Sequence, residues 1–269
     1  MNFIDDQGIE RSLGNISPAY FAAAHPIYGD APTQPMISRS EWPKIVAALG
    51  NGPDAWYTSP VHDQSVVSMC NASATTSAHE TARYRLGLPL VKLSGGDLYH
   101  RISGGRDQGS TLEDGLREAS TNGMASVDVV PYLDWRGNHG QAAIDDRKRF
   151  VVLEYCLLPT FDHCFSAVAE GFDLISGVLW FNNYKPDSDG WLPARGVGNT
   201  GGHAVHGYKP AMRNGHFGIW HKNSWTPSWG LQGKCVFPEE AYGSQIGGWW
   251  GIRSVVREAT DIPAPKEAA

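Results

Sequence analysis

The periodic pattern of the chain changes near residue 171, and this change constrains the fold more than any other feature. Before it, small and apolar residues recur at helical spacing, for instance every four residues from 68 to 86. After it, the segments 174–180, 202–208 and 218–225 are rich in apolar and β-branched residues and predict strands. Helices followed by strands predict an α+β protein with two lobes.

Other segments refine this prediction. Residues 40–49 and 161–169 are predicted helices, and 145–157 predicts either a third helix or a helix that runs into a strand. A further helix follows the sequence Ser110-Thr111-Leu112-Glu113, which has the form of a capping box, and ends at Asn122-Gly123. The strand at 202–208 is expected to turn at Pro210.

Composition excludes several classes of protein. The chain has 269 residues, 41% hydrophobic and 19% charged, which suits one enzyme-sized unit or two packed lobes. Its net charge is −6, from 22 basic and 28 acidic residues, and it has no basic run, which argues against nucleic-acid binding. No apolar stretch approaches 18 residues and the start is acidic, so we expect no membrane span and an intracellular location. The four cysteines form no CxxC pair, so we expect no metal and no cofactor.

The same patterns predict four regions. Residues 1–57 are expected to form an N-terminal arm or short leader, and 58–150 a helical lobe. Residues 151–258 are expected to form a β-rich lobe, and 259–269 a disordered tail with two prolines.

Cys70 is the candidate nucleophile. It lies two residues into the helix predicted to begin near Ser68, where unpaired backbone N–H groups stabilise a thiolate. Gln64 lies six residues upstream, and its amide is placed to donate to an oxyanion together with the backbone N–H of Cys70.

Two downstream blocks supply a base and its partner. Gly202 precedes His203 at the start of a predicted strand, and Asn223 precedes Ser224-Trp225 in another. An asparagine that accepts from one imidazole nitrogen fixes the tautomer, so that the other nitrogen can face the thiol. An indole over that hydrogen bond would shield it from water.

These blocks together resemble the signature of papain-like cysteine peptidases. The order Gln64, Cys70, His203, Asn223 is the order of that family, and the motif continues with Trp225 and Trp229-Gly230. The sequence 107–110 followed by a helix is similar to the family's substrate-cleft loop. The resemblance covers roughly residues 58–257.

The resemblance implies a helical lobe, a β-barrel-like lobe and an active site in the cleft between them. Cys70 would attack a peptide carbonyl, His203 would move the proton, Asn223 would hold His203, and Gln64 would complete the oxyanion hole. Trp225 would cover the His–Asn contact, supported by Trp229, and an acyl-enzyme thioester would form on Cys70. Substrate contacts are expected at Gly109, Ser110, Gly202 and Met69.

The chain departs from the family around the nucleophile. Met69 and Asn71 stand where the family has a small residue and an aromatic, so Met69 is expected to crowd the cleft. The family's cleft disulfide would join positions 67 and 107, which are Val67 and Asp107 here. The missing disulfide and the short leader suggest the cytoplasm of a bacterium or a phage-infected cell, with a virion as a further setting.

The principal hypothesis is a cysteine endopeptidase that acts on protein or peptide substrates. Two alternatives stay open: a catalytically impaired papain-fold binding or structural module, motivated by Met69 and Asn71, and an amidase or isopeptidase with the same site. The sequence does not predict an oligomeric state.

Overall fold

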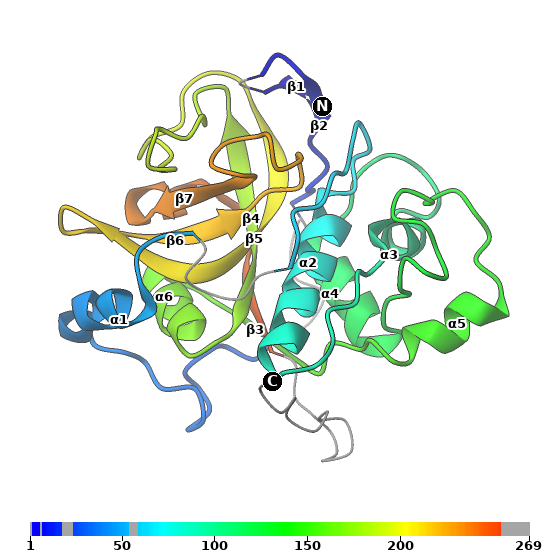
Figure 1. The fold of residues 1–269 in the computed structure, drawn as a ribbon, viewed down its shortest axis with the longest axis horizontal. Helices are drawn as coiled ribbons and strands as arrows, with labels where there is room; N and C mark the ends of the chain where they lie inside the picture. Colours follow the sequence, from blue (N-terminus) through cyan, green and yellow to red (C-terminus); the bar gives the residue numbers. More distant parts are fainter. Residues whose placement is uncertain (1, 6, 18–23, 54–58, 254–269) are drawn as a thin grey trace, which may run out of the picture.

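The computed structural model describes residues 2–5, 7–17, 24–53 and 59–253, and it has the two-lobe α+β architecture expected from the sequence (Figure 1). One half is helical and the other is built on an antiparallel sheet. The helices are α1 (Trp42–Leu49), α2 (Cys70–Arg85), α3 (Gly95–Ile102), α4 (Leu112–Thr121), α5 (Gln141–Arg147) and α6 (Phe161–Ala169), with short 3₁₀ turns at Arg39–Glu41 and Glu239–Ser244.

The main sheet has six strands in the order β3-β8-β4-β5-β6-β7, all paired antiparallel. These strands are β3 (Glu154–Leu157), β4 (Asp173–Phe181), β5 (Thr200–Arg213), β6 (His216–Lys222), β7 (Lys234–Pro238) and β8 (Gln245–Arg253). A separate pair, β1 (Asn2–Ile4) and β2 (Glu10–Ser12), lies near the N-terminus, above the junction of the two halves in Figure 1.

The expected turn at Pro210 is wrong, because β5 continues through it. Pro210 pairs with Ile219 of β6, just after a register shift between Gly207 and Lys209. The pairing of β5 with β4 ends at Gly207, so Pro210 lies where β5 has a neighbour on one side only. A proline, which has no N–H to donate, is tolerated at such an edge position.

The capping prediction for α4 also needs correction. The N-cap is Thr111, whose hydroxyl accepts from Asp114 N at 3.1 Å, and not Ser110. Ser110 is engaged elsewhere, since its hydroxyl accepts from Asn71 Nδ2 at 3.0 Å. The helix itself is confirmed.

The central helix α2 lies between the helical half and the sheet, and packs against β5, β4, α3 and α4. Its residues from Cys70 to Ala82 are all buried. Small side chains along this stretch let neighbouring elements approach on every side. The nucleophile candidate is therefore fixed by a helix with almost no exposed surface along its first three turns.

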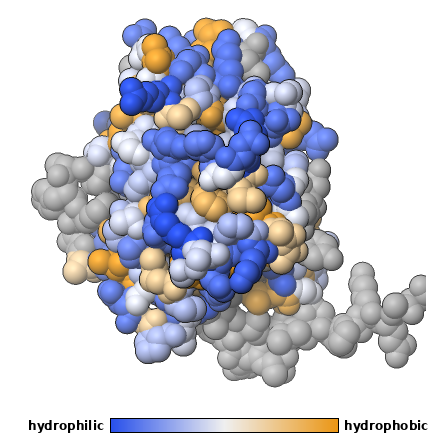
Figure 2. Space-filling model, turned by 90° about the vertical axis from the view of Figure 1, so that its left-hand side faces the viewer, coloured by the Kyte–Doolittle hydropathy of each residue, from blue (hydrophilic) through white to orange (hydrophobic). Residues whose placement is uncertain are grey.

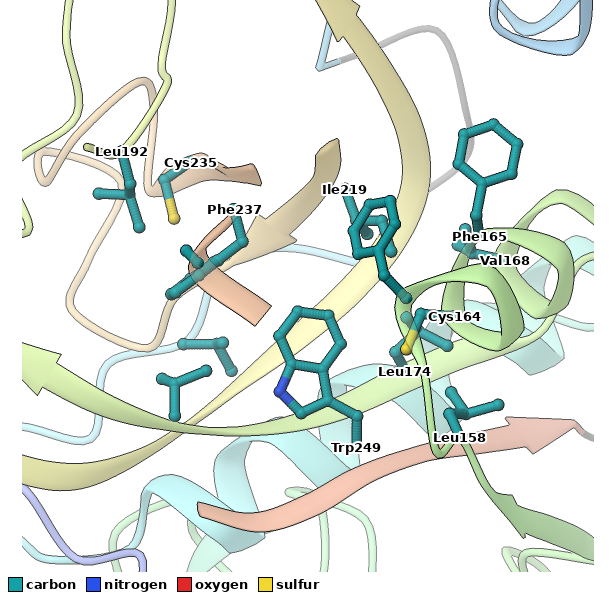
Figure 3. Packing of buried hydrophobic residues seen from close by; sticks show 14 of the residues in the cluster. Leu158, Cys164, Phe165, Val168, Leu174, Leu192, Ile219, Cys235, Phe237 and Trp249 are labelled. Carbon is teal, nitrogen blue, oxygen red and sulfur yellow. The ribbon is translucent and has the colours of Figure 1, made fainter. Parts of the chain in front are cut away.

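The core of the β-rich half is aromatic (Figure 3). The indole of Trp249 lies among Phe237, Ile219 and Leu174. Trp42 of α1 stacks on Phe165 of α6, with ring centroids 3.9 Å apart. The part of the predicted N-terminal arm that forms α1 thus packs on the β-rich half.

The outer face of the β-rich half is mostly hydrophilic, with apolar residues in small patches (Figure 2). Within the described ranges, no helix has the length and apolar character needed to cross a membrane. The predicted tail at 259–269 lies outside the described residues. The exact lobe boundaries stay a prediction.

Candidate active site

Cys70 is the first residue of α2, so the helix begins two residues later than the start near Ser68 that the sequence predicted. Met69 is the N-cap and supplies no side-chain cap, so the first N–H groups of the helix are left for another acceptor. The backbone N–H groups of Gly14, Ala204 and Asn71 also act on the sulfur and favour the thiolate. Ala204 directly follows His203 in β5, which brings the two halves of the predicted site together.

His203 and Asn223 form the predicted hydrogen bond. His203 Nε2 lies 2.8 Å from Asn223 Oδ1, and both residues are buried. Because Oδ1 can only accept, the Nε2 atom carries the proton and Nδ1 is left as an acceptor. Nδ1 is buried and has no hydrogen-bond partner in the part of the chain that the structure describes.

Tryptophans enclose this pair. The ring of Trp225 stacks on His203 with centroids 4.7 Å apart, and Trp229 packs edge-on against Trp225 at 5.5 Å. Trp180 of β4 meets the other side of His203 edge-on at 5.1 Å. The sequence had suggested Trp225 and Trp229 for this place, whereas Trp180 was expected only as an apolar residue of the predicted strand 174–180.

The side chain of Gln64 is held with its N–H groups toward the cleft. Its Oε1 accepts from Ser224 Oγ, and its Nε2 donates to Ser12 O at 3.0 Å and to Val67 O at 2.9 Å. Gln64 Nε2, the predicted oxyanion donor, is therefore bonded to two main-chain carbonyls, and that of Ser12 comes from a distant segment of the chain.

That segment is residues 7–17, a part of the predicted N-terminal arm that includes β2 and passes between the two halves (Figure 1). These residues are called the arm from here on. Ser110 N donates to Gly14 O at 2.9 Å, and Ile16 N donates to Ser110 O at 3.0 Å. On the other side, Asn15 N donates to Gly202 O at 2.9 Å. The arm thus pairs with both Ser110 and Gly202, two of the residues predicted to bind substrate.

Glycines make this close passage possible. A β-carbon on Gly14 would lie 2.1 Å from Ser68 O, and one on Gly109 would lie 2.1 Å from Gly14 O. Gly109 also has a positive φ of 80°, a conformation that side chains disfavour. The arm and the cleft loop (residues 107–110) therefore meet backbone to backbone beside Cys70.

The covered site is electrically neutral. Burial raises the pKa of Cys70 to about 11, against the opposing effect of nearby backbone N–H groups. Burial lowers the pKa of His203 to about 4, although its hydrogen bond to Asn223 acts in the other direction. A thiolate at Cys70 and an imidazolium at His203 are thus not the forms that this conformation favours, because both groups are buried.

The cleft loop is tied to the start of α2 by hydrogen bonds. Asp107 Oδ1 accepts from Ser68 N at 2.8 Å and from the hydroxyl of Tyr99 at 2.9 Å. The same hydroxyl accepts from Gly109 N at 2.9 Å. These bonds lie beside positions 67 and 107, where the resemblance implies a disulfide, so polar contacts join the two segments instead. From the sequence, Asp107 stands out only as a position where the family has a cysteine.

Met69 lies in the core of the helical half. It is fully buried, and a β-carbon on Gly95 would collide with its methyl group. Its side chain is directed into that core beside α3, so the prediction that Met69 crowds the cleft is wrong.

A Ser-His-Asp arrangement, separate from the Cys70-His203-Asn223 site, joins α2 to the sheet. Ser77 Oγ is 3.0 Å from His206 Nδ1, and His206 Nε2 is 2.7 Å from Asp173 Oδ1. All three residues are buried, and the cavity beside Ser77 measures only about 10 Å³, roughly the space of one water. This arrangement therefore fixes α2 to the sheet and offers no room for a substrate.

No group of three His, Cys, Asp or Glu among the described residues is placed to hold a metal ion.

A hollow of about 640 Å³ borders the arm. Phe3 and Leu13 line one side of it, and Trp180, Asn199 and Thr200 line the other.

Comparison with known proteins places the fold. No family model matches the chain, and no curated protein matches it in sequence. Among solved structures it is similar to xylellain, a cysteine protease from Xylella fastidiosa, at a TM-score of 0.73 and 20% identity over 91% of this chain and 97% of that one. It is also similar to procathepsin B from Trypanosoma congolense (TM-score 0.67, 17% identity, 90% and 85% covered) and to bromelain from Ananas comosus (0.60, 19%, 74% and 94%). The chain therefore has the papain-like two-lobe fold.

Proposed function

We propose that this chain is a cysteine peptidase that hydrolyses peptide bonds in protein or peptide substrates, and that its own arm keeps it latent. Cys70 is the nucleophile, His203 the base, Asn223 the group that orients His203, and Gln64 an oxyanion donor. The intracellular, bacterial or phage setting expected from the sequence stays a prediction.

One observation carries the proposal: the cleft already holds a peptide. The main chain of the arm pairs with Ser110 on one wall and with Gly202 on the other. Gln64 donates to the carbonyl of Ser12 in the same segment. A cleft that binds an extended backbone beside a helix-terminal cysteine has the geometry that amide hydrolysis needs.

The chemistry begins when the arm leaves. Water then reaches Cys70 and His203, burial no longer penalises their charged forms, and the thiol proton moves to the free Nδ1 of His203. The thiolate attacks the substrate carbonyl carbon, and the oxyanion accepts hydrogen bonds from Cys70 N and Gln64 Nε2. His203 gives its proton to the leaving amine, which leaves a thioester on Cys70. A water molecule, deprotonated by His203, then hydrolyses the thioester and restores the thiol.

The test combines covalent labelling with turnover. We expect an epoxysuccinyl thiol inhibitor to modify Cys70 and none of the buried thiols Cys156, Cys164 and Cys235, as read by mass spectrometry. We expect an arm-displaced variant to cleave a mixed peptide library. The matched variants Cys70→Ala and His203→Ala should abolish cleavage while the thermal unfolding curve stays intact.

Two outcomes would favour the alternatives. Rapid labelling of Cys70 without cleavage of linear peptides, but with release of ammonia or an isopeptide-linked amine, would favour an amidase or isopeptidase. Labelling of Cys70 no faster than that of the other three thiols, even after arm displacement, would refute the nucleophile assignment and favour a binding module.

A further inference from the structure

The side chain of Asn15 fills a small site beside the catalytic residues. Asn15 is only 6% exposed, and its Nδ2 donates to Ile246 O at 3.0 Å and to His203 O at 3.4 Å. A β-carbon on Gly177 would lie 2.8 Å from Asn15 Nδ2 and 3.0 Å from Leu112 Cδ1. The site is therefore enclosed by Gly177, Leu112 and Ile246.

An irregularity of the sheet builds this site. The register between β4 and β8 shifts between Ser176 and Val178, which leaves Gly177 without a partner in β8. Gly247 and Gly248, which follow Ile246 in β8, both have positive φ. Such bulges re-aim backbone groups next to active sites. Here the bulge leaves the carbonyl of Ile246 facing Asn15.

The polar groups that Asn15 meets in the site are acceptors. Ile246 O and His203 O are main-chain carbonyls, which accept hydrogen bonds and cannot donate them. The other end of the amide, Asn15 Oδ1, is buried and has no partner in the described part of the chain. The site therefore recognises an N–H group at the tip of a small side chain.

We propose that this site selects an asparagine side chain in the peptide substrate that replaces the arm, an inference that rests on the proposed peptidase function. The arm pairs through its main chain with Gly202 and Ser110, at Asn15 and its two neighbours. A substrate that uses the same wall contacts places one of its side chains where Asn15 lies.

Aspartate and leucine side chains should bind less well than asparagine in this site. Aspartate has nearly the shape of asparagine, but it would set a carboxylate against two carbonyl oxygens. Leucine would remove the hydrogen bonds that Asn15 Nδ2 donates to both carbonyls and would put nothing in their place. The lack of a side chain at Gly177 makes room for the amide of Asn15, since a β-carbon there would lie 2.8 Å from Asn15 Nδ2.

The experiment measures binding without turnover. It uses the full chain carrying Gly14→Ala, which displaces the arm, and a hexapeptide with the sequence of residues 12–17, Ser-Leu-Gly-Asn-Ile-Ser. The readout is protection of Cys70 from the epoxysuccinyl label. Matched hexapeptides replace only the asparagine, by aspartate or by leucine. We expect the asparagine peptide to protect at a concentration at least about tenfold lower than either one.

Equal protection by the three peptides, or better protection by the leucine peptide, would overturn the inference. A second readout uses the intact arm: Asn15→Asp should raise the labelling rate of Cys70 at least about tenfold above that of the unmodified chain, with the unfolding temperature unchanged. An unchanged rate would overturn the inference as well. The proposed function fails separately, through absence of cleavage by the arm-displaced chain.

Discussion

Replacing Gly14 with alanine should open the active site. A β-carbon at this position would lie 2.1 Å from Ser68 O and 2.7 Å from Ser68 C, both backbone atoms next to the start of α2. Backbone cannot move aside as a side chain can, and Gly14 is not among the glycines with positive φ, so an alanine there is disfavoured by the collision alone. The arm must then leave the cleft, at least from Ser12 to Ile16.

The size of the effect follows from the state of the thiol. With the arm in place, the Cys70 pKa of about 11 leaves roughly one thiol in ten thousand ionised at neutral pH. A solvated cysteine with a pKa of about 8.5 is ionised to about 3%, which is a gain of roughly 300-fold. The lower basicity of that thiolate reduces its intrinsic reactivity by roughly tenfold to twentyfold. The labelling rate should therefore rise roughly fifteenfold to thirtyfold, and more if His203 becomes an imidazolium beside it.

The assay is the second-order rate of labelling of Cys70 by an epoxysuccinyl inhibitor at neutral pH. Gly140→Ala is the matched control, because a β-carbon there would meet nothing within 4 Å. It should label at the rate of the unmodified chain. If Gly14→Ala also labels at that rate while its unfolding temperature is unchanged, the arm does not limit access to Cys70, and the proposed latency is refuted.

Three further predictions concern groups around the cleft. In the arm-displaced chain, Asn223→Ala should lower kcat at least about tenfold with little change in KM, since His203 loses the acceptor that fixes its tautomer. Asp107→Ala should raise KM about tenfold, because the cleft loop loses its bonds to α2 and to Tyr99, while Asp107→Asn keeps an acceptor and should recover most of the affinity. The arm should be most firmly closed between about pH 6.5 and 8.5. Closure holds the His203 pKa at about 4 and the Cys70 pKa at about 11, so pH values below and above that window each favour the open state, by up to about tenfold per pH unit. Amide exchange in the arm measures the opening. In His203→Gln, the opening on the acid side should be lost.

The sequence predicted the catalytic geometry better than the local structure. The relation of His203 to Asn223, the aromatic cover by Trp225 and the placement of Cys70 at a helix start depend on residue types whose chemistry is specific, and the structure has these features. Fold class followed from the order of helical and strand periodicity, which survives errors at individual boundaries.

Local features failed where a tertiary contact competes with a local rule. Serine is a common N-cap residue, but the hydroxyl of Ser110 bonds to Asn71 and its main chain bonds to the arm. Pro210 is a common turn residue, yet the bulge before it and the end of the β4 pairing let the strand continue. Helix α3 was missed because it opens with Gly95-Gly96, which are poor helix formers, and both are needed where Met69 and Asp134 pack closely.

The path of the arm could not be derived from the sequence, because no periodicity marks a segment that pairs with loops on two walls. The position of the arm gives one cause both for the proposed latency of the site and for the low reactivity of the Cys70 thiol. The arm binds the cleft through hydrogen bonds that need no charge, and we infer that it also contributes to the burial that raises the cost of ionising Cys70 and His203. Any variant that loosens the arm should therefore move two observables together: faster amide exchange at residues 12–16 and faster labelling of Cys70. Variants at Arg11, which holds the arm through Trp225 O at 3.1 Å, and at Gly14 should lie on one line in a plot of the two rates. A variant that exchanges rapidly yet keeps an unreactive thiol would separate the two effects and refute the common cause.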